Sequence, residues 1–264
     1  MLGSIAGDMI GSPYEGMRHN IRTTDFELFV PRSRFTDDTV LTVAVADAVM
    51  RGGGYTEKLK EYYALYPHAG YGGAFKRWAA SSQTEAYNSY GNGSAMRVSP
   101  VGYAFDTLEE VLAEAKRSAA VTHNHPEGIR GAQAAAAAVF LAREGEDKDG
   151  IREYIEKEFG YDLSESTDSL RTWYALEYDP LYISCQRSVP PAIRAFLDSD
   201  GFEDAVRKIV SIGGDSDTMA CITGGIAQAF YGVPRAIEDE VMARLDERLS
   251  MVVLEFTERY PGRG

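Results

Sequence analysis

Apolar residues recur with helical spacing along this chain of 264 residues, whereas alternating runs flanked by hairpin turns are hard to find. Val40–Met50 and Gln133–Leu141 are apolar on nearly every side, which is typical of buried helices. Leu108–Ala120 and Ile237–Phe256 instead have one apolar and one charged face. Buried helices covered by amphipathic ones predict an all-α fold, a globular helical bundle with a central layer.

Glycines and prolines mark where several of these helices should end or begin. Gly52–Gly54 follows the first buried helix and is expected to end it. Pro126 is expected in the first turn of a helix, and Pro190-Pro191 is expected to open another. No proline-rich or serine-rich linker and no solenoid repeat divides the sequence, so we expect one domain over residues 1–264.

The charge of the chain limits its partners. Its 40 acidic and 27 basic side chains give a formal net charge of −13. Such a field repels polyanions, which disfavours a nucleic-acid groove and a basic membrane-binding face. The acidic segment Glu144–Asp168 is expected to be a solvated face without chemistry. An anionic ligand would therefore need backbone N–H groups or a cation to offset the charge locally.

Cysteine content and apolar segment length indicate where the protein works. Cys185 and Cys221 are too few for a disulfide framework, which favours a reducing, cytoplasmic compartment. The apolar stretch Gly131–Ala142 is shorter than the roughly 20 residues needed to cross a bilayer. The first residues lack the basic start of a signal peptide. We expect a mature, soluble, monomeric protein with no membrane partner.

Two acidic motifs precede two apolar helices. Phe35–Thr39 contains Asp37 and Asp38, and Gly213–Thr218 contains Asp215 and Asp217. Ordinary helix capping and the helix dipole explain each motif taken alone. If the two helix starts converge, however, four carboxylates would repel one another unless protons or cations lay among them. The pairing therefore favours a site for Mg²⁺ or Mn²⁺, cations that prefer oxygen ligands.

Three further segments are candidates for ligand contact. The glycine-rich run Ser89–Arg97 can present free N–H groups to a phosphate, although a turn without a ligand explains it equally well. It lacks the lysine of a P-loop. His123 and His125 have no third residue nearby to complete a zinc site, so helix entry or ligand contact by one imidazole remains. Glu15, in a turn after a short helix, is in isolation a surface carboxylate.

Covalent catalysis is disfavoured by the sequence. It contains no Gly-x-Ser-x-Gly elbow, and Cys185 and Cys221 stand among apolar residues without an activating neighbour. A metal cluster with an additional carboxylate remains. Those parts suit the activation of water against a glycosidic or phosphoester bond.

Taken in order, these motifs resemble the ADP-ribosylglycohydrolase family, which includes dinitrogenase reductase-activating glycohydrolases. The resemblance runs from about Gly3 to Gly232 and rests on Gly7–Glu15, Phe35–Thr39, Gly91–Arg97, Thr122–Pro126 and Gly213–Thr218. It implies an orthogonal all-α helical bundle with a binuclear site for two Mg²⁺ or Mn²⁺ ions at helix N-termini. It also implies hydrolysis of the bond between ADP-ribose and a modified acceptor, N-linked or O-linked. The implied metal ligands are Thr36, Asp37, Asp38, Asp215, Asp217 and Thr218.

The resemblance also implies catalytic and substrate-binding roles. Glu15 corresponds to a glutamate close to the metals, and Asp37 or Asp38 can accept a proton from the attacking water. The loop Ser89–Gly93 resembles members that cleave O-linked ADP-ribose, including serine linkages. Ser216, Met219 and Gln228 are mild departures from the common pattern, and none removes a ligand. The expected substrate contacts are Ser89, Tyr90, Gly91, Asn92, Gly93, Ser94, Met96 and His123.

Two alternatives to hydrolysis of a modified protein remain open. The chain could bind ADP-ribose without turning it over, although such a protein has no need of six oxygen ligands. It could also hydrolyse a free small molecule such as O-acetyl-ADP-ribose. The segments Tyr14–Arg34 and Tyr66–Asn88 are the candidates for reading the acceptor. A nucleic acid is expected as a partner only if it is an ADP-ribosylated acceptor.

Overall fold

Helices account for the regular structure throughout the described part of the chain. The computed structural model describes residues 1–16, 19–52, 54–176 and 181–262. These residues contain no β-strand, only one isolated bridge between Gly91 and Ser184, which confirms the predicted all-α class. No described helix is long and apolar enough to span a bilayer. The helices from the N-terminus to the middle of the chain are α1 (Leu2–Gly11), the short 3₁₀ helix η1 (Ser12–Tyr14), α2 (Asp37–Arg51), α3 (Tyr55–Leu65), α4 (Gly73–Ala79), α5 (Gly93–Met96), α6 (Ser99–Ala104), α7 (Leu108–Ala120) and α8 (Pro126–Glu144).

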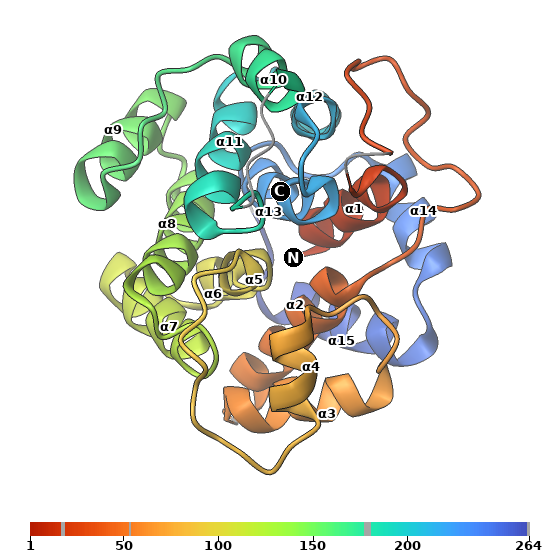
Figure 1. Ribbon diagram of the computed structural model, residues 1–264, viewed down its shortest axis with the longest axis vertical. Helices are drawn as coiled ribbons and strands as arrows, with labels where there is room; N and C mark the ends of the chain where they lie inside the picture. Colours follow the sequence, from red (N-terminus) through yellow and green to blue (C-terminus); the bar gives the residue numbers. More distant parts are fainter. Residues whose placement is uncertain (17–18, 53, 177–180, 263–264) are drawn as a thin grey trace.

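The second half of the chain supplies α9 (Lys148–Phe159), α10 (Thr167–Leu176), α11 (Cys185–Leu197), α12 (Phe202–Ile212), α13 (Ser216–Tyr231), α14 (Arg235–Arg244) and α15 (Glu247–Arg259). In Figure 1, α1 and α13 lie near the centre of the molecule. Helices α2, α8, α11 and α12 contact this central pair. The first helix of the chain and a helix more than 200 residues later therefore form the middle of the core.

Glycines allow α1 and α13 to approach closely. Gly3, Gly7 and Gly11 recur every fourth residue and so share one face of α1. A Cβ atom at any of these positions would overlap a backbone carbonyl of α13. Every residue of α1 is buried. The spacing of small residues therefore brings the backbones of two helices together and draws their polar side chains to a common point.

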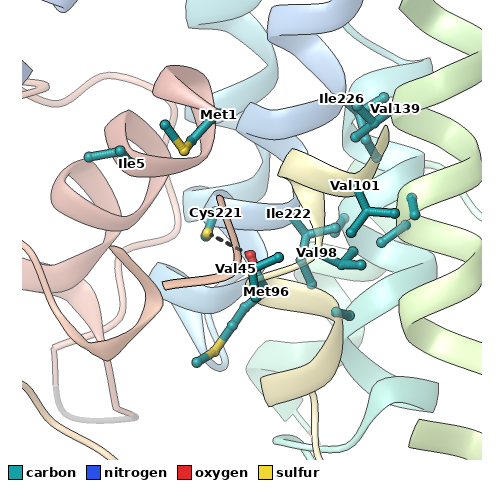
Figure 2. Packing of buried hydrophobic residues seen from close by; sticks show 14 of the residues in the cluster. Met1, Ile5, Val45, Met96, Val98, Val101, Val139, Cys221, Ile222 and Ile226 are labelled. Atoms are coloured by element: carbon teal, nitrogen blue, oxygen red, sulfur yellow. Dashed lines mark hydrogen bonds between the residues drawn. The ribbon is translucent and has the colours of Figure 1, made fainter. Parts of the chain in front are cut away.

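Apolar side chains from several helices fill the space around this pair. Figure 2 shows Met1 directly before α1, Ile5 of α1, Val45 of α2 and Ile222 and Ile226 of α13 within one buried group. The thiol of Cys221 donates to the carbonyl oxygen of Met96 at 3.3 Å, so the region that ends α5 is tied to α13.

Several predicted helix limits agree with the structure. The apolar segments Val40–Met50 and Gln133–Leu141 lie within α2 and α8, and α7 spans Leu108–Ala120 as expected. Gly52 ends α2 in the left-handed conformation with φ 62°, Gly53 lies outside the described residues, and Gly54 precedes α3. Pro126 is the first residue of α8. Nearly all acidic side chains of Glu144–Asp168 are exposed, which confirms a solvated face.

Two predicted helix limits are wrong. The segment Ile237–Phe256 forms two helices because Leu245 is extended and the carboxylate of Asp246 accepts from the backbone N–H of Leu249, starting α15. Pro190 and Pro191 lie inside α11 rather than opening it. That helix begins at Cys185, whose N–H donates to the carbonyl of Tyr90 at 3.0 Å. A contact distant in sequence thus sets the helix start.

Candidate active site

The carboxylate of Asp8, in α1, fixes the start of α2. It accepts hydrogen bonds from the N–H and hydroxyl of Thr36, at 2.9 and 2.7 Å, and from the N–H and hydroxyl of Thr39, at 3.1 and 2.5 Å. Burial raises the pKa of Asp8 to about 6, and these hydrogen bonds oppose the rise. Asp8 is not among the site residues predicted from the sequence. Its position as the one charged residue of a buried apolar helix was the available signal.

The start of α2 presents Asp37 and Asp38. Thr36 caps the helix, and its hydroxyl accepts from the N–H of Asp38 at 3.2 Å. The N–H of Asp37 donates to the carbonyl of Ala69 at 2.8 Å, so the chain before α4 also supports this turn. Burial, followed by the charge of Asp8, raises the pKa of Asp37 to about 8 and that of Asp38 well above its ordinary value.

The start of α13 presents the second acidic pair. Asp215 is the N-cap residue and Asp217 lies in the first turn, where its carboxylate accepts from the N–H of Thr218 at 2.9 Å. Burial raises the pKa of Asp215 to about 6. Burial and the neighbouring Asp215 raise the pKa of Asp217 well above its ordinary value. The two predicted acidic motifs therefore converge.

The carboxylates form two overlapping groups. Oxygens of Asp8, Asp38 and Asp217 lie within 4.8 Å of one another, and so do oxygens of Glu15, Asp215 and Asp217. Asp217 belongs to both groups. Together with Asp37, which lies next to Asp38 at the start of α2, these residues form what we call the acidic centre.

The residues of the acidic centre fit a divalent cation. One carboxylate oxygen of Asp38, Oδ1, is buried without a hydrogen-bond partner. The other oxygen, Oδ2, lies 3.2 Å from the hydroxyl of Thr36 and 3.4 Å from that of Thr218. Donors that are all oxygens, most of them on carboxylates, are the set that Mg²⁺ and Mn²⁺ prefer. Burial is the main cause of the raised pKa values, and repulsion between the carboxylates adds to it for Asp37, Asp38 and Asp217. A cation among these groups would offset both effects.

A cleft of about 430 Å³ opens onto the acidic centre. Its other walls include Gly70, Phe75, Tyr87 and Ile183. Of the residues expected to contact substrate, six line the cleft, namely Ser89, Gly91, Asn92, Gly93, Met96 and His123. Glu15, Asp37, Asp38, Asp215, Asp217 and Thr218 also line it.

Tyr90, Ser94 and Thr36 do not line the cleft. The ring of Tyr90 is 45% exposed and packs edge-on against His125 at 5.5 Å. The hydroxyl of Ser94 is buried and donates to the carbonyl of Gly128 at 2.7 Å. Thr36 lies behind Asp38, where its side chain contacts Asp8. Ser94 and Thr36 thus hold the surrounding backbone.

The amide of Asn92 links the glycine-rich loop to the acidic centre. Its Nδ2 donates to Asp215 at 2.6 Å and to the hydroxyl of Ser188 at 2.9 Å. The backbone N–H of Asn92 donates to the carbonyl of Ile183 at 2.8 Å. The loop is therefore fixed against both α13 and the start of α11.

The two histidines have different surroundings. His125 is the N-cap of α8, where Nδ1 accepts from the N–H of Glu127 at 3.1 Å. His123 is buried at the cleft, with Nδ1 2.7 Å from the hydroxyl of Thr122. Burial, with a smaller effect from Arg97, lowers the pKa of His123 well below its ordinary value, so its imidazole is neutral. His125 thus has the helix-entry position, and His123 alone faces the ligand space.

Comparisons with known proteins agree with the arrangement of these elements. The family model described as ADP-ribosylglycohydrolase matches residues 1–263. Human ADP-ribosylhydrolase ARH3 is 27% identical, with 90% of this chain and 86% of that protein covered. The ADP-ribosylarginine hydrolase Tri1 of Pseudomonas putida is 24% identical over 88% of this chain and 70% of its own length. A solved structure titled ADP-ribosylglycohydrolase-related protein complex superposes with a TM-score of 0.71 at 23% identity, covering 98% of this chain and 95% of the other.

Proposed function

Since this chain belongs to the ADP-ribosylglycohydrolase family, we propose that its cleft hydrolyses the glycosidic bond between ADP-ribose and a modified acceptor and releases ADP-ribose. The observation that carries the proposal is the convergence of Asp37, Asp38, Asp215 and Asp217 at one end of a cleft whose other wall is the loop Ser89–Gly93. Cleavage of a glycosidic bond passes through a cationic, oxocarbenium-like transition state. Negative charge around the anomeric carbon stabilises that state.

We propose that the reaction depends on two Mg²⁺ or Mn²⁺ ions. The residues that would hold them are Thr36, Asp37, Asp38, Asp215, Asp217 and Thr218, with the unpartnered oxygen of Asp38 as the strongest support. A divalent ion supplies a lowered pKa for a water molecule and fixed positions for the ribose hydroxyls. Asp8 positions Thr36 and thereby the start of α2.

The side chains of the cleft divide the work around the scissile bond. Asp37 or Asp38 accepts the proton of the attacking water. Glu15, exposed at the mouth, orients the acceptor side of the bond. The N–H of Gly91 donates to the hydroxyl of Ser89 at 3.1 Å. The N–H of Gly93 would receive the pyrophosphate, a contact that needs no net positive charge on the protein.

His123 and Gly93 shape the substrate side of the cleft. A Cβ on Gly93 would lie 3.1 Å from Nε2 of His123, so glycine leaves room between the loop and the imidazole. The neutral imidazole can donate a hydrogen bond to a ribose hydroxyl or accept one from it. Met96 supplies an apolar floor next to them.

The acceptor linkage is proposed to be O-linked, including serine. The run Ser89–Gly93, which resembles members that cleave O-linked ADP-ribose, supports this choice. Hydrolysis of O-acetyl-ADP-ribose and binding of ADP-ribose without turnover are the alternatives. We further propose that residues 1–264 act as one domain and as a monomer in the cytoplasm, where its two free, buried cysteines suit a reducing environment.

Release of ADP-ribose from serine-linked and arginine-linked peptides, measured with Mg²⁺, with Mn²⁺ and with EDTA, tests the proposal. We expect release only with a divalent ion, and its loss in Asp37→Ala and in Asp215→Ala. Asp149→Ala, which removes an exposed carboxylate on α9, is the matched control and should retain activity. Activity retained in both cleft variants would refute the mechanism. Tight binding of ADP-ribose without product from any substrate would favour the binding-protein alternative.

A further inference from the structure

A second cavity shares Glu15 with the cleft. It has a volume of about 530 Å³ and we call it the rim cavity. Glu15 lines both the rim cavity and the cleft. The other residues that line the rim cavity are Ser12, Pro13, Gly16, His19, Arg32 and Arg34. None of the roles proposed for ADP-ribose or for the cations involves this cavity.

The walls of the rim cavity are fixed by hydrogen bonds. The N–H of Arg34 donates to the hydroxyl of Ser12 at 3.2 Å, and that hydroxyl donates to the carbonyl of Met9 at 3.1 Å. The guanidinium of Arg32 lies over the ring of Tyr14, 5.7 Å from its centroid. Nδ1 of His19 lies 3.2 Å from the carbonyl oxygen of Glu15. The cavity is therefore built against η1, the same element that positions Glu15.

The rim cavity has two arginines, Arg32 and Arg34, against one carboxylate, Glu15, in a chain whose net charge is −13. Arg32 and Arg34 are both exposed, and neither guanidinium has a carboxylate within ion-pair distance among the residues that the structure describes. Most other arginines of this acidic chain are paired, for example Arg194 with Asp198 and Arg207 with Glu203. Two unpaired cations next to the acidic centre therefore form a local anion-attracting spot.

The position of Glu15 assigns the rim cavity to the acceptor. If ADP-ribose occupies the cleft, its anomeric carbon lies at the acidic centre, and the acceptor continues past Glu15. On the strength of the proposed hydrolysis, we propose that the rim cavity binds carboxylate side chains next to the modified residue, so that the enzyme selects peptides with acidic flanks. A peptide with basic flanks would meet Arg32 and Arg34 and be repelled. A short acidic peptide fits better than a nucleic acid, because the net charge of −13 repels an extended polyanion.

Matched peptides test this inference. Each carries one serine-linked ADP-ribose flanked by glutamates, by glutamines or by lysines, and kcat/KM is measured for each. Two exposed charge contacts predict roughly a tenfold preference for glutamate over lysine flanks at low salt. The preference should shrink as NaCl screens the charges. In Arg32→Gln/Arg34→Gln the kcat/KM values for glutamate and lysine flanks should be about equal, since the two contacts are absent.

A charge-matched control and a binding measurement complete the design. Lys116→Gln/Lys157→Gln removes two exposed cations from α7 and α9, far along the chain, and should keep the preference. Circular dichroism checks that both double variants are folded. Fluorescence anisotropy in EDTA measures the affinity for the same three peptides without turnover. The same order of affinities is expected.

The outcomes separate this inference from the proposed function. Equal kcat/KM for glutamate and lysine flanks, or a preference that survives Arg32→Gln/Arg34→Gln, would overturn the inference while hydrolysis itself stands. Absence of product from every peptide, with the order of affinities retained, would overturn the hydrolysis and support the rim cavity. Tighter binding of a DNA oligonucleotide with ADP-ribose on its terminal phosphate, lost in the double variant, would replace the peptide by a nucleic-acid acceptor.

Discussion

Without divalent ions, the protein should lose stability as the pH rises from about 5 to about 8. Asp8 and Asp215 have pKa values of about 6 in the folded protein, compared with 3.8 for an unperturbed aspartate. A carboxylate with a raised pKa holds a proton in the folded state that the unfolded chain has released. The stability from this proton is fully present below pH 4 and is lost as the pH rises through the folded-state pKa.

The size of the loss follows from the two pKa values. Between pH 5 and pH 8, each of these carboxylates lowers the free energy of unfolding by about 1.4 kcal/mol, so that the pair accounts for about 3 kcal/mol. Asp37, whose pKa rises to about 8, adds to the fall. Millimolar Mg²⁺ should offset part of it, because an ion present at 100 times its Kd contributes about 2.7 kcal/mol.

Urea unfolding followed by circular dichroism at a series of pH values measures this effect, once in EDTA and once in MgCl₂. Asp215→Asn removes one of the titrating groups and its repulsion of Asp37, Asp38 and Asp217, and should reduce the fall in EDTA by at least about 1.4 kcal/mol. Asp149→Asn, at an exposed carboxylate on α9, should leave it unchanged. A free energy of unfolding that stays constant or increases between pH 5 and pH 8 in EDTA would refute the reasoning, as would an equal fall in MgCl₂.

Three substitutions test other parts of the structure. Gly7→Ala places a Cβ against the carbonyl of Ala220 and should lower the free energy of unfolding by about 2 kcal/mol or more. Gly72→Ala is the control, because its Cβ meets open space, and should change the free energy of unfolding by less than about 0.5 kcal/mol. Equal effects of the two substitutions in urea unfolding would contradict the close packing of α1 and α13. Asn92→Ala removes the 2.6 Å hydrogen bond to Asp215 and should lower kcat/KM by roughly 10-fold to 100-fold, so an unchanged value would remove Asn92 from the site. Arg97→Ala leaves the carbonyl of Ser118 and the hydroxyl of Thr122 without their buried donor and opens a cavity. It should lower the free energy of unfolding by about 3 kcal/mol. A loss below about 1 kcal/mol in urea unfolding would contradict this role.

The pattern of apolar residues predicted most of the central helices, because burial on all sides leaves a local signature. It failed where a distant contact decides. The start of α11 depends on the pairing of Cys185 with Tyr90, and the break between α14 and α15 depends on the cap at Asp246. Neither is visible from hydrophobic spacing alone.

The acidic centre was predictable in part for the same reason. The two aspartate pairs stand next to buried helices, so their convergence could be expected from the sequence. The hydrogen bond from Asn92 to Asp215 joins residues 123 positions apart, and only the fold brings them together. Asp8 supports Thr36 from another helix in the same way. The assignment of the predicted metal ligands, and of one domain over residues 1–264, stays a prediction.

The segment 19–35, which borders the rim cavity, has no regular secondary structure. Near one end, Asn20 donates to the carbonyls of Tyr14 and Gly214 and accepts from the N–H of Gly214; near the other, the N–H of Arg34 reaches Ser12. These anchors tie the two ends of the segment to η1 and to the turn before α13, and leave its middle outside the acidic centre. Substitutions in the middle of the segment should therefore change the choice of acceptor while the acidic centre keeps its geometry.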